Sequence, residues 1–159
     1  MAREEELVYV VDTSALVDLP ILYPRAVFDG LWTSLEQLIA DQRLIAPHEV
    51  YRELGKKDDE VFKWVKRHKA MFVDLGAAQQ ALLREILGAF PNWIDRETDK
   101  PVADPLVIAL ARSGSTPRCV VAHENPGGKG ATRIPNVCQQ YGIDYVKLAE
   151  MSVREGWRF

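Results

Sequence analysis

The sequence predicts an α/β domain with a mostly parallel central sheet, and two observations lead to this prediction. Short runs rich in β-branched and aromatic side chains, without polar alternation, occur at 7–11, 43–47 and 118–122, and such runs are typical of strands buried on both faces. Segments with apolar residues at helical spacing lie between them, as expected for strands that alternate with helices. A chain of 159 residues suits one domain, which we expect to span 1–159.

Each further element follows from local periodicity or from a turn residue. Val27, Leu31, Leu35 and Leu38 recur at helical spacing in an amphipathic segment, and Pro105 is typical of a first helical position. After the first strand, we expect helices from Thr13, over Pro24–Gln42, from His48, over 58–69, over Ala77–Phe90, over 104–113 with Pro105 at its first position, and from near Pro135. The further strands are expected over 43–47, 70–75 (a brief one), 118–122 and 143–148. We expect a loop over 91–103, a glycine-rich loop over 123–133, and terminal aromatic residues folded back onto the core.

Composition narrows the class of protein. The net charge of −3 argues mildly against a protein that depends on bulk affinity for nucleic acid, although a nuclease with a local acidic site remains compatible. The apolar runs are too short to span a membrane, and the first residues lack the hydrophobic core of a signal peptide. Cys119 and Cys138 have neither metal-ligand nor redox spacing. We therefore expect a cytoplasmic protein with no membrane contact.

Four acids stand out because they end strands or lie on apolar helix faces. Asp12 directly follows the first strand, and Glu124 comes two residues after the strand over 118–122. Asp104 precedes Val107, Ile108 and Ala111 at buried-stripe spacings, and Glu53 lies at the margin of a buried stripe. Each acid also has a structural interpretation: Asp12 or Asp104 caps a helix, Glu53 is a surface residue with its stem along the core, and Glu124 is a loop acid.

Taken together, the four acids predict a metal site. Carboxylates brought into one cleft repel one another and raise each other's pKa unless a cation neutralises them. Oxygen ligands of this kind suit Mg²⁺ or Mn²⁺, and such ions can activate water and stabilise the leaving oxygen in phosphodiester cleavage.

The order of these motifs resembles that of PIN-domain nucleases over nearly the whole chain. The matching stretches are "YVVDTSAL", "APHEVYREL", "ADPLVIALA" and "VVAHEN", while "YPRAVFDGLW" and "IPNVCQQYGI" resemble a PIN-like bacterial and archaeal subfamily similar to VapC toxins. The resemblance implies a Rossmann-like three-layer α/β/α sandwich. It also implies an Mg²⁺- or Mn²⁺-dependent endoribonuclease that leaves 5′-phosphate and 3′-hydroxyl ends.

By this resemblance, Asp12, Glu53, Asp104 and Glu124 are the catalytic and metal-binding acids. Glu124 stands where the family more commonly has Asp, and Ala122 stands where it has Thr or Ser. Ser14 would contact a metal-bound water or the nucleic acid. Lys129 and Arg133, on the glycine-rich loop after Glu124, would contact RNA phosphates. The partners implied are an RNA substrate, a second copy in a homodimer and, if a neighbouring gene makes the chain a toxin, a cognate antitoxin protein.

Two other classes of function stay open. One is a non-catalytic PIN-like module that binds RNA or a protein, which need not hold divalent ions. The other is a haloacid-dehalogenase-like phosphatase, because "DTSA" follows a strand; that class places a second acid where this chain has Ser14.

Overall fold

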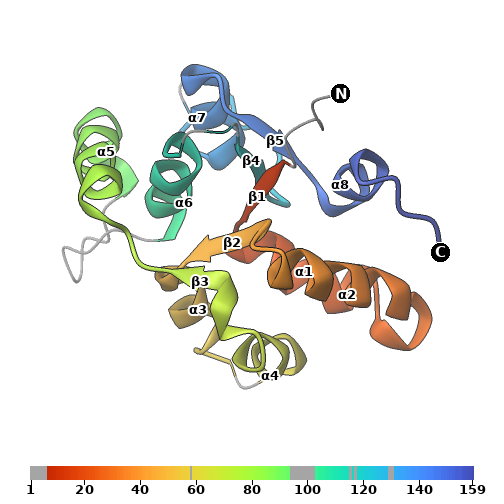
Figure 1. Ribbon diagram of the computed structural model, residues 1–159. Helices are drawn as coiled ribbons and strands as arrows, with labels where there is room; N and C mark the ends of the chain where they lie inside the picture. Colours follow the sequence, from red (N-terminus) through yellow and green to blue (C-terminus); the bar gives the residue numbers. More distant parts are fainter. Residues whose placement is uncertain (1–6, 58, 94–102, 115, 117, 129–130) are drawn as a thin grey trace, which may run out of the picture.

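The computed structural model of the chain describes residues 7–57, 59–93, 103–114, 116, 118–128 and 131–159. A five-stranded sheet runs through its centre in the order β3-β2-β1-β4-β5 (Figure 1). Each pairing between described neighbouring strands is parallel, which confirms the predicted α/β class and parallel sheet. The strands are β1 (Val8–Val11), β2 (Leu44–Pro47), β3 (Phe72–Val73), β4 (Arg118–Val121) and β5 (Asp144–Val146).

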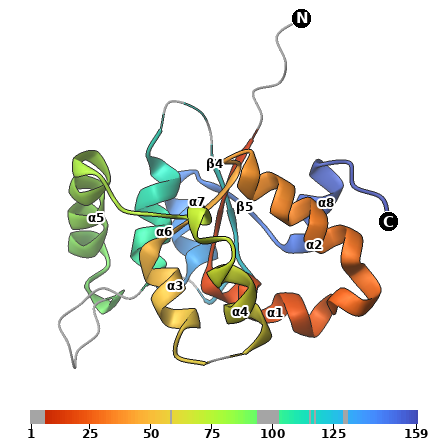
Figure 2. The same cartoon turned by 60° about the horizontal axis from the view of Figure 1, so that its bottom comes forward.

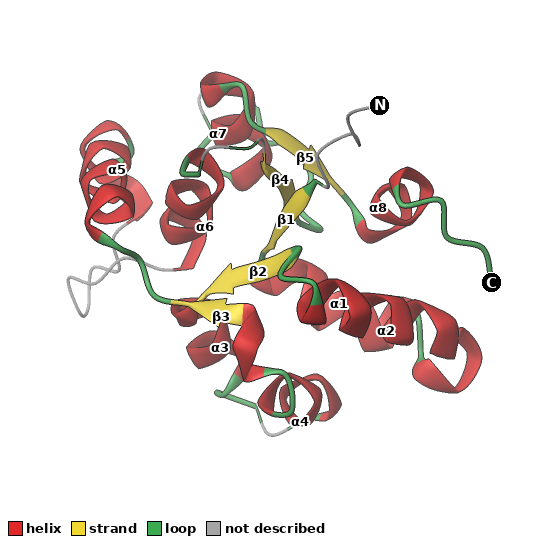
Figure 3. Cartoon of the chain, in the orientation of Figure 1, coloured by secondary structure: helices red, strands yellow, loops and turns green. Residues whose placement is uncertain are grey.

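Helices cover both faces of this sheet and complete a Rossmann-like three-layer sandwich. Figure 3 shows α5, α6 and α7 on one side, and α1, α2, α4 and α8 on the other. Helix α5 packs against α6, on the side of α6 away from the sheet (Figures 1 and 2). The described helices are α1 (Thr13–Leu22), α2 (Arg25–Ala40), α3 (His48–Leu54), α4 (Glu60–Lys66), α5 (Ala77–Ala89), α6 (Ala103–Arg112), α7 (Ile134–Tyr141) and α8 (Leu148–Arg154), with 3₁₀ turns η1 (Lys69–Met71) and η2 (Pro91–Trp93).

Strand β1 and helix α6 form the centre of the core, which is why both can position site residues rigidly. Tyr9, Val10 and Val11 are at most 1% exposed, as their unbroken apolar run predicted. Helix α6 is buried from Pro105 to Ala111 because it lies between the sheet and α5. In the part of the chain that the structure describes, no helix is both long and apolar enough to cross a membrane.

Part-buried polar contacts of Glu155, the residue that follows the C-terminal helix α8, tie the end of this helix to β1. The Tyr9 hydroxyl donates to Glu155 Oε2 over 2.7 Å, and the Arg43 guanidinium donates to both oxygens of Glu155 at 2.8 Å. Burial raises the pKa of Tyr9, and the hydrogen bond to Glu155 adds to that effect. Residues at the two ends of the chain are thus joined directly.

Two predicted details near helix ends are wrong, and a third is confirmed in part. Helix α8 was not predicted, because its seven residues bury only Leu148 and Met151 and carry little periodic signal. Helix α6 begins at Ala103 in the described part of the chain, so Pro105 is not its first residue. Of the terminal aromatic residues, Trp157 packs against the core, whereas Phe159 is 68% exposed and its ring lies against Gly30 of α2.

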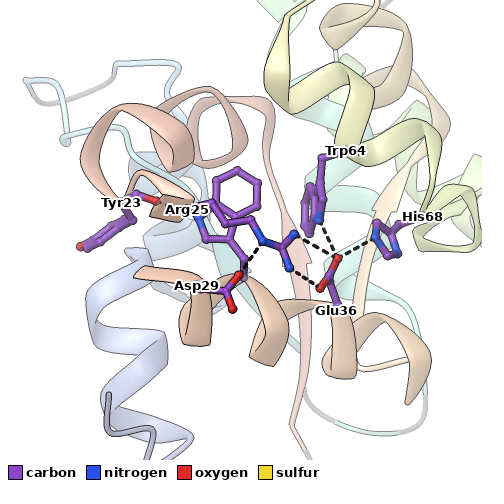
Figure 4. A network of polar contacts seen from close by, with 7 residues as sticks. Tyr23, Arg25, Asp29, Glu36, Trp64 and His68 are labelled. Carbon is purple, nitrogen blue, oxygen red and sulfur yellow. Dashed lines mark hydrogen bonds and ion pairs between the residues drawn. The ribbon is translucent and has the colours of Figure 1, made fainter. Parts of the chain in front are cut away.

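A polar network joins α2 to the segment that contains α4 (Figure 4). Glu36 accepts from Arg25 Nη2 at 3.0 Å, from the buried Trp64 Nε1 at 3.1 Å and from His68 Nε2 at 2.9 Å. Arg25 also pairs with Asp29 at 2.8 Å. Burial alone would raise the pKa of Glu36, but the hydrogen bonds from Arg25 and Trp64 outweigh it, so this pKa is lowered.

Candidate functional site

The topology of the sheet singles out the carboxyl ends of β1 and β4. In the sheet, β2 and β3 lie on one side of β1, and the later strands β4 and β5 lie on its other side. Ligands of open α/β sheets bind outside the carboxyl ends of the strands at such a reversal of strand order. Asp12 lies at this point, since its backbone N–H donates to Val121 O over 2.8 Å.

Asp12 both caps a helix and keeps one oxygen uncommitted. It is the N-cap of α1, and its Oδ2 accepts from Ser14 N at 3.2 Å and from Ser14 Oγ at 2.6 Å. The side chain is buried, yet among the described residues Oδ1 has no hydrogen-bond partner, and neither has the neighbouring buried Thr13 Oγ1. Unpartnered buried oxygens are costly. The capping interpretation is therefore correct but incomplete, because capping uses Oδ2 and does not account for the buried Oδ1.

The charges of the predicted acids act on Asp12 and Asp104. Burial, followed by the charges of Asp12, Glu124 and Glu53 in that order, raises the pKa of Asp104 to about 8. Burial is also the largest cause that raises the pKa of Asp12 to about 6; the charges of Glu124 and Glu53 act in the same direction, and hydrogen bonds from Ser14 act against it. Strongly perturbed carboxyls that share charged neighbours are typical of functional sites.

Glu53 and Glu124 are each oriented by a backbone amide. Glu53 Oε1 accepts from Ala103 N at 3.0 Å, which joins α3 to the start of α6. Glu124 Oε2 accepts from Ile134 N at 3.1 Å, which joins the loop after β4 to the start of α7. Both contacts explain why these two acids hold fixed positions around Asp12 and Asp104.

The residues predicted to contact nucleic acid have different outcomes. The single hydroxyl proton of Ser14 is directed to Asp12, and its oxygen accepts from His123 N at 2.9 Å, so Ser14 positions the acid. Arg133 is exposed, and its Nη1 donates to Asn125 O at 3.4 Å. Lys129 lies outside the described residues.

His123 and Asp18 were missed by the sequence analysis, although both support the site. His123 Nε2 accepts from Leu148 N at 3.1 Å, so Nδ1 carries the proton that is shared with Asp18 Oδ2 at 3.0 Å. This pair fixes the end of β4 against α1 and α8. The signal was present in the sequence, because Asp18 follows Ser14 by four residues and lies on the same helix face.

The donor set suits Mg²⁺ or Mn²⁺, but the ligands are not gathered as they would be around an ion. Carboxylate oxygens are the ligands that these hard cations prefer, and Asp12 Oδ1 lacks a partner within the residues that the structure describes. Among the described residues, however, no group of three or more Asp, Glu, His or Cys side chains is arranged as metal ligands. Binding an ion would therefore require at least one of the four acids to turn toward the others.

We expect Ser14→Ala to raise, by about one unit, the lower of the two pKa values that shape the acid limb of the pH profile of the predicted activity. Hydrogen bonds from Ser14 lower the pKa of Asp12, and a hydrogen bond to a charged group contributes about 1.5–3 kcal/mol, or about 1–2 pKa units. The measurement is kcat/KM against pH with Mn²⁺. Ser14→Thr should restore the profile and Ser152→Ala should leave it unchanged, whereas an equal loss at every pH would contradict this role.

Comparison with known families adds one finding. The family model described as "Domain of unknown function (DUF4411)" matches residues 9–159. That span includes all four acids and runs from β1 to the last residue. No curated protein and no solved structure matches the chain.

Proposed function

We propose that this chain, which belongs to the DUF4411 family, is a metal-dependent endoribonuclease. The main observation behind the proposal is the electrostatic interaction between the carboxyl groups of Asp12 and Asp104, at the point where the strand order reverses. Both carboxyls have raised pKa values in a shared field of negative charge, and Asp12 Oδ1 has no partner in the described part of the chain. A bound cation would relieve both features at once. The resemblance to PIN-domain nucleases, noted from the motifs, supports RNA as the substrate.

Each of these residues would have a distinct role in the reaction. Asp12, Glu53, Asp104 and Glu124 would hold Mg²⁺ or Mn²⁺, with Ser14 fixing Asp12 Oδ2 so that Oδ1 stays available. When bound, the ion would activate the attacking water and stabilise charge on the leaving 3′ oxygen. Asp104 must release its proton before it can act as a ligand, so activity should increase as the pH rises toward 8. Arg133 would contact the RNA backbone.

The wider role proposed with this activity is that of a cytoplasmic nuclease acting as a homodimer. The toxin of a toxin–antitoxin pair is the specific case that the resemblance to VapC toxins suggests. Its identification depends on an adjacent gene for a cognate antitoxin and on growth arrest after induced expression.

We expect the purified protein to cleave single-stranded or structured RNA with Mg²⁺ or Mn²⁺ and to lose this activity in EDTA. Glu53→Gln should reduce the rate by about a hundredfold or more, because a metal ligand supplies several kcal/mol of transition-state stabilisation. The amide oxygen of Gln can still accept from Ala103 N, so the fold should persist.

Glu60→Gln is the matched control for this experiment, since Glu60 is an exposed acid in the first turn of α4. It should cleave like the wild type. Cleavage that resists EDTA, or equal rates for the two Gln variants, would refute the proposal.

A non-catalytic binding module is the second candidate, and one observation favours it. The described acids are not arranged as a ready metal site. Calorimetric titration with Mn²⁺ separates the two candidates, because the nuclease must bind the ion through Asp12 and Asp104 while the module need not. A phosphatase, by contrast, would hydrolyse a small aryl phosphate.

A further inference from the structure

A cavity of about 460 Å³ lies at the same edge of the sheet as the four acids. Pro47 and Val73, the last residues of β2 and β3, line it together with residues of α3, α5 and α6. Strand β2, whose last residue lines the cavity, is the neighbour of β1, which ends next to Asp12.

The cavity and the acidic site share one wall, helix α3. On α3, Glu49 lines the cavity and Glu53 lies one helical turn further along, on the same side of the helix. On α6, Leu106 lines the cavity, while Asp104, two residues earlier, lies on the other side of that helix. The hydrogen bond from Ala103 N to Glu53 holds these two helices together. A chain bound at Glu53 would therefore reach the cavity along α3.

Apolar and polar side chains contribute equally to the lining of the cavity. The apolar residues are Pro47, Val73, Leu75, Leu83 and Leu106, and the polar ones are His48, Glu49, Asp74, Gln80 and Arg84. Arg84 is exposed and makes no hydrogen bond or ion pair with any described residue, so its guanidinium is available to a ligand. The volume lies in the range of small-molecule sites, and the mixed lining suits a group with apolar faces and a polar edge.

The charges of the lining residues favour a nucleobase over a phosphate as the group bound in the cavity. Asp74 and Glu49 also line the cavity, and Glu49 is paired with Arg52 at 2.9 Å. Carboxylates would repel a phosphate, whereas they can accept hydrogen bonds from the exocyclic amines of a base. The amide Nε2 of Gln80 donates to Leu75 O at 3.2 Å, and this contact fixes another polar group at the rim.

We propose that this cavity receives a nucleobase of the RNA substrate, beside the phosphodiester that the four acids act upon. The base would lie against the leucine side chains, and Arg84 would donate to its edge or to the adjoining ribose. This inference rests on the proposed nuclease function, and it makes the cavity the determinant of sequence preference next to the cut.

The test uses two variants of the cavity and one control. Arg84→Ala removes the unpaired donor, and Leu83→Trp fills the cavity. Lys63→Ala is the control, because it removes one exposed positive charge from α4, outside the cavity. Binding is measured in EDTA by fluorescence polarisation with a labelled single-stranded RNA of about 12 nucleotides. Cleavage of a randomised RNA pool with Mn²⁺, followed by sequencing of the ends, gives the base preference.

We expect Arg84→Ala to weaken binding by about tenfold, a typical loss for a hydrogen bond from a charged donor. Leu83→Trp should flatten the base preference at one position beside the cut, and Lys63→Ala should match the wild type. Arg84→Ala changes a solvent-exposed side chain, so it remains informative if Leu83→Trp fails to fold, as checked by circular dichroism.

The outcomes separate this inference from the nuclease proposal. If the wild type cleaves RNA but both cavity variants bind and cut with its affinity and preference, the inference is wrong and the nuclease proposal stands. If no cleavage occurs yet binding depends on Arg84, the nuclease proposal fails and with it the role of the cavity beside a cut, while the cavity stands as a binding site for an RNA base. Absence of both binding and cleavage in the wild type would overturn both, and a protein ligand would then be sought for the cavity.

Discussion

Asp104→Asn is expected to reduce metal-dependent RNA cleavage by about a thousandfold or more while raising the thermal stability of the metal-free protein. The rate falls because a neutral amide is a poor ligand for a divalent ion and cannot replace the charge that helps to bind it. Stability rises because burial and three neighbouring acids make the charged form of Asp104 unfavourable in the folded state.

The pH dependence of this stability has a definite direction. The pKa of Asp104 rises from 3.8 to about 8 on folding, so between these values the folded state holds a proton that the unfolded state releases. Its contribution to the free energy of unfolding is therefore complete below about pH 4 and is lost as the pH rises toward 8. Thermal melts in EDTA should show a steeper fall with pH for the wild type than for Asp104→Asn.

Asp41→Asn is the control for Asp104→Asn, because Asp41 is an exposed acid after the end of α2. It should leave both cleavage and the pH slope unchanged. At pH 7.5 the midpoint of Asp104→Asn should exceed that of the wild type by a few degrees, since about 1 kcal/mol moves it by about 2–4 °C in a chain of this size. A marked loss of stability would instead indicate that the charge of Asp104 is structural.

The second large effect is on stability alone. Glu36→Ala should lower the free energy of unfolding by about 3 kcal/mol, because it leaves Trp64 Nε1 buried without an acceptor and separates Arg25 and His68 from their shared carboxylate. Urea denaturation measures this change. Glu36→Gln keeps an acceptor for the indole and should cost less than Glu36→Ala.

The contribution of Glu36 depends on pH in the opposite direction to that of Asp104. The pKa of Glu36 is lowered on folding, so its contribution is present above the ordinary value of 4.5 and is lost as the pH falls through the lower folded value. Glu85→Ala breaks a more exposed pair with Arg112 at 3.3 Å and should cost about 0.5 kcal/mol or less. If Glu36→Ala and Glu85→Ala lowered the free energy of unfolding equally, the network around Glu36 would add no stability beyond that of an exposed ion pair.

The strands could be predicted from the sequence because burial on both faces leaves unbroken apolar runs, as in Val8–Val11 and Arg118–Val121. The acids could be found because each ends a strand or borders a buried stripe. Hydrogen bonding could not be predicted in the same way. That Asp12 caps with Oδ2 and keeps Oδ1 unpartnered depends on a rotamer, which periodicity does not specify. The cavity lined by Leu83 and Leu106 likewise depends on how α5 and α6 pack, which no local pattern encodes.

The central place of β1 has a consequence for how the chain folds. Its partner β2 follows within about forty residues, but its other partner, β4, begins at Arg118, and the contact from Tyr9 to Glu155 spans 146 residues. During synthesis one edge of the apolar strand Val8–Val11 therefore stays unpaired until most of the chain is made, a condition that favours association between strands of different chains. Glu124, which follows β4, joins Asp12 only at that late stage. A chain interrupted after α6 would thus present an open strand edge and an incomplete set of acids, so its folding would be slow and dependent on the last quarter of the sequence.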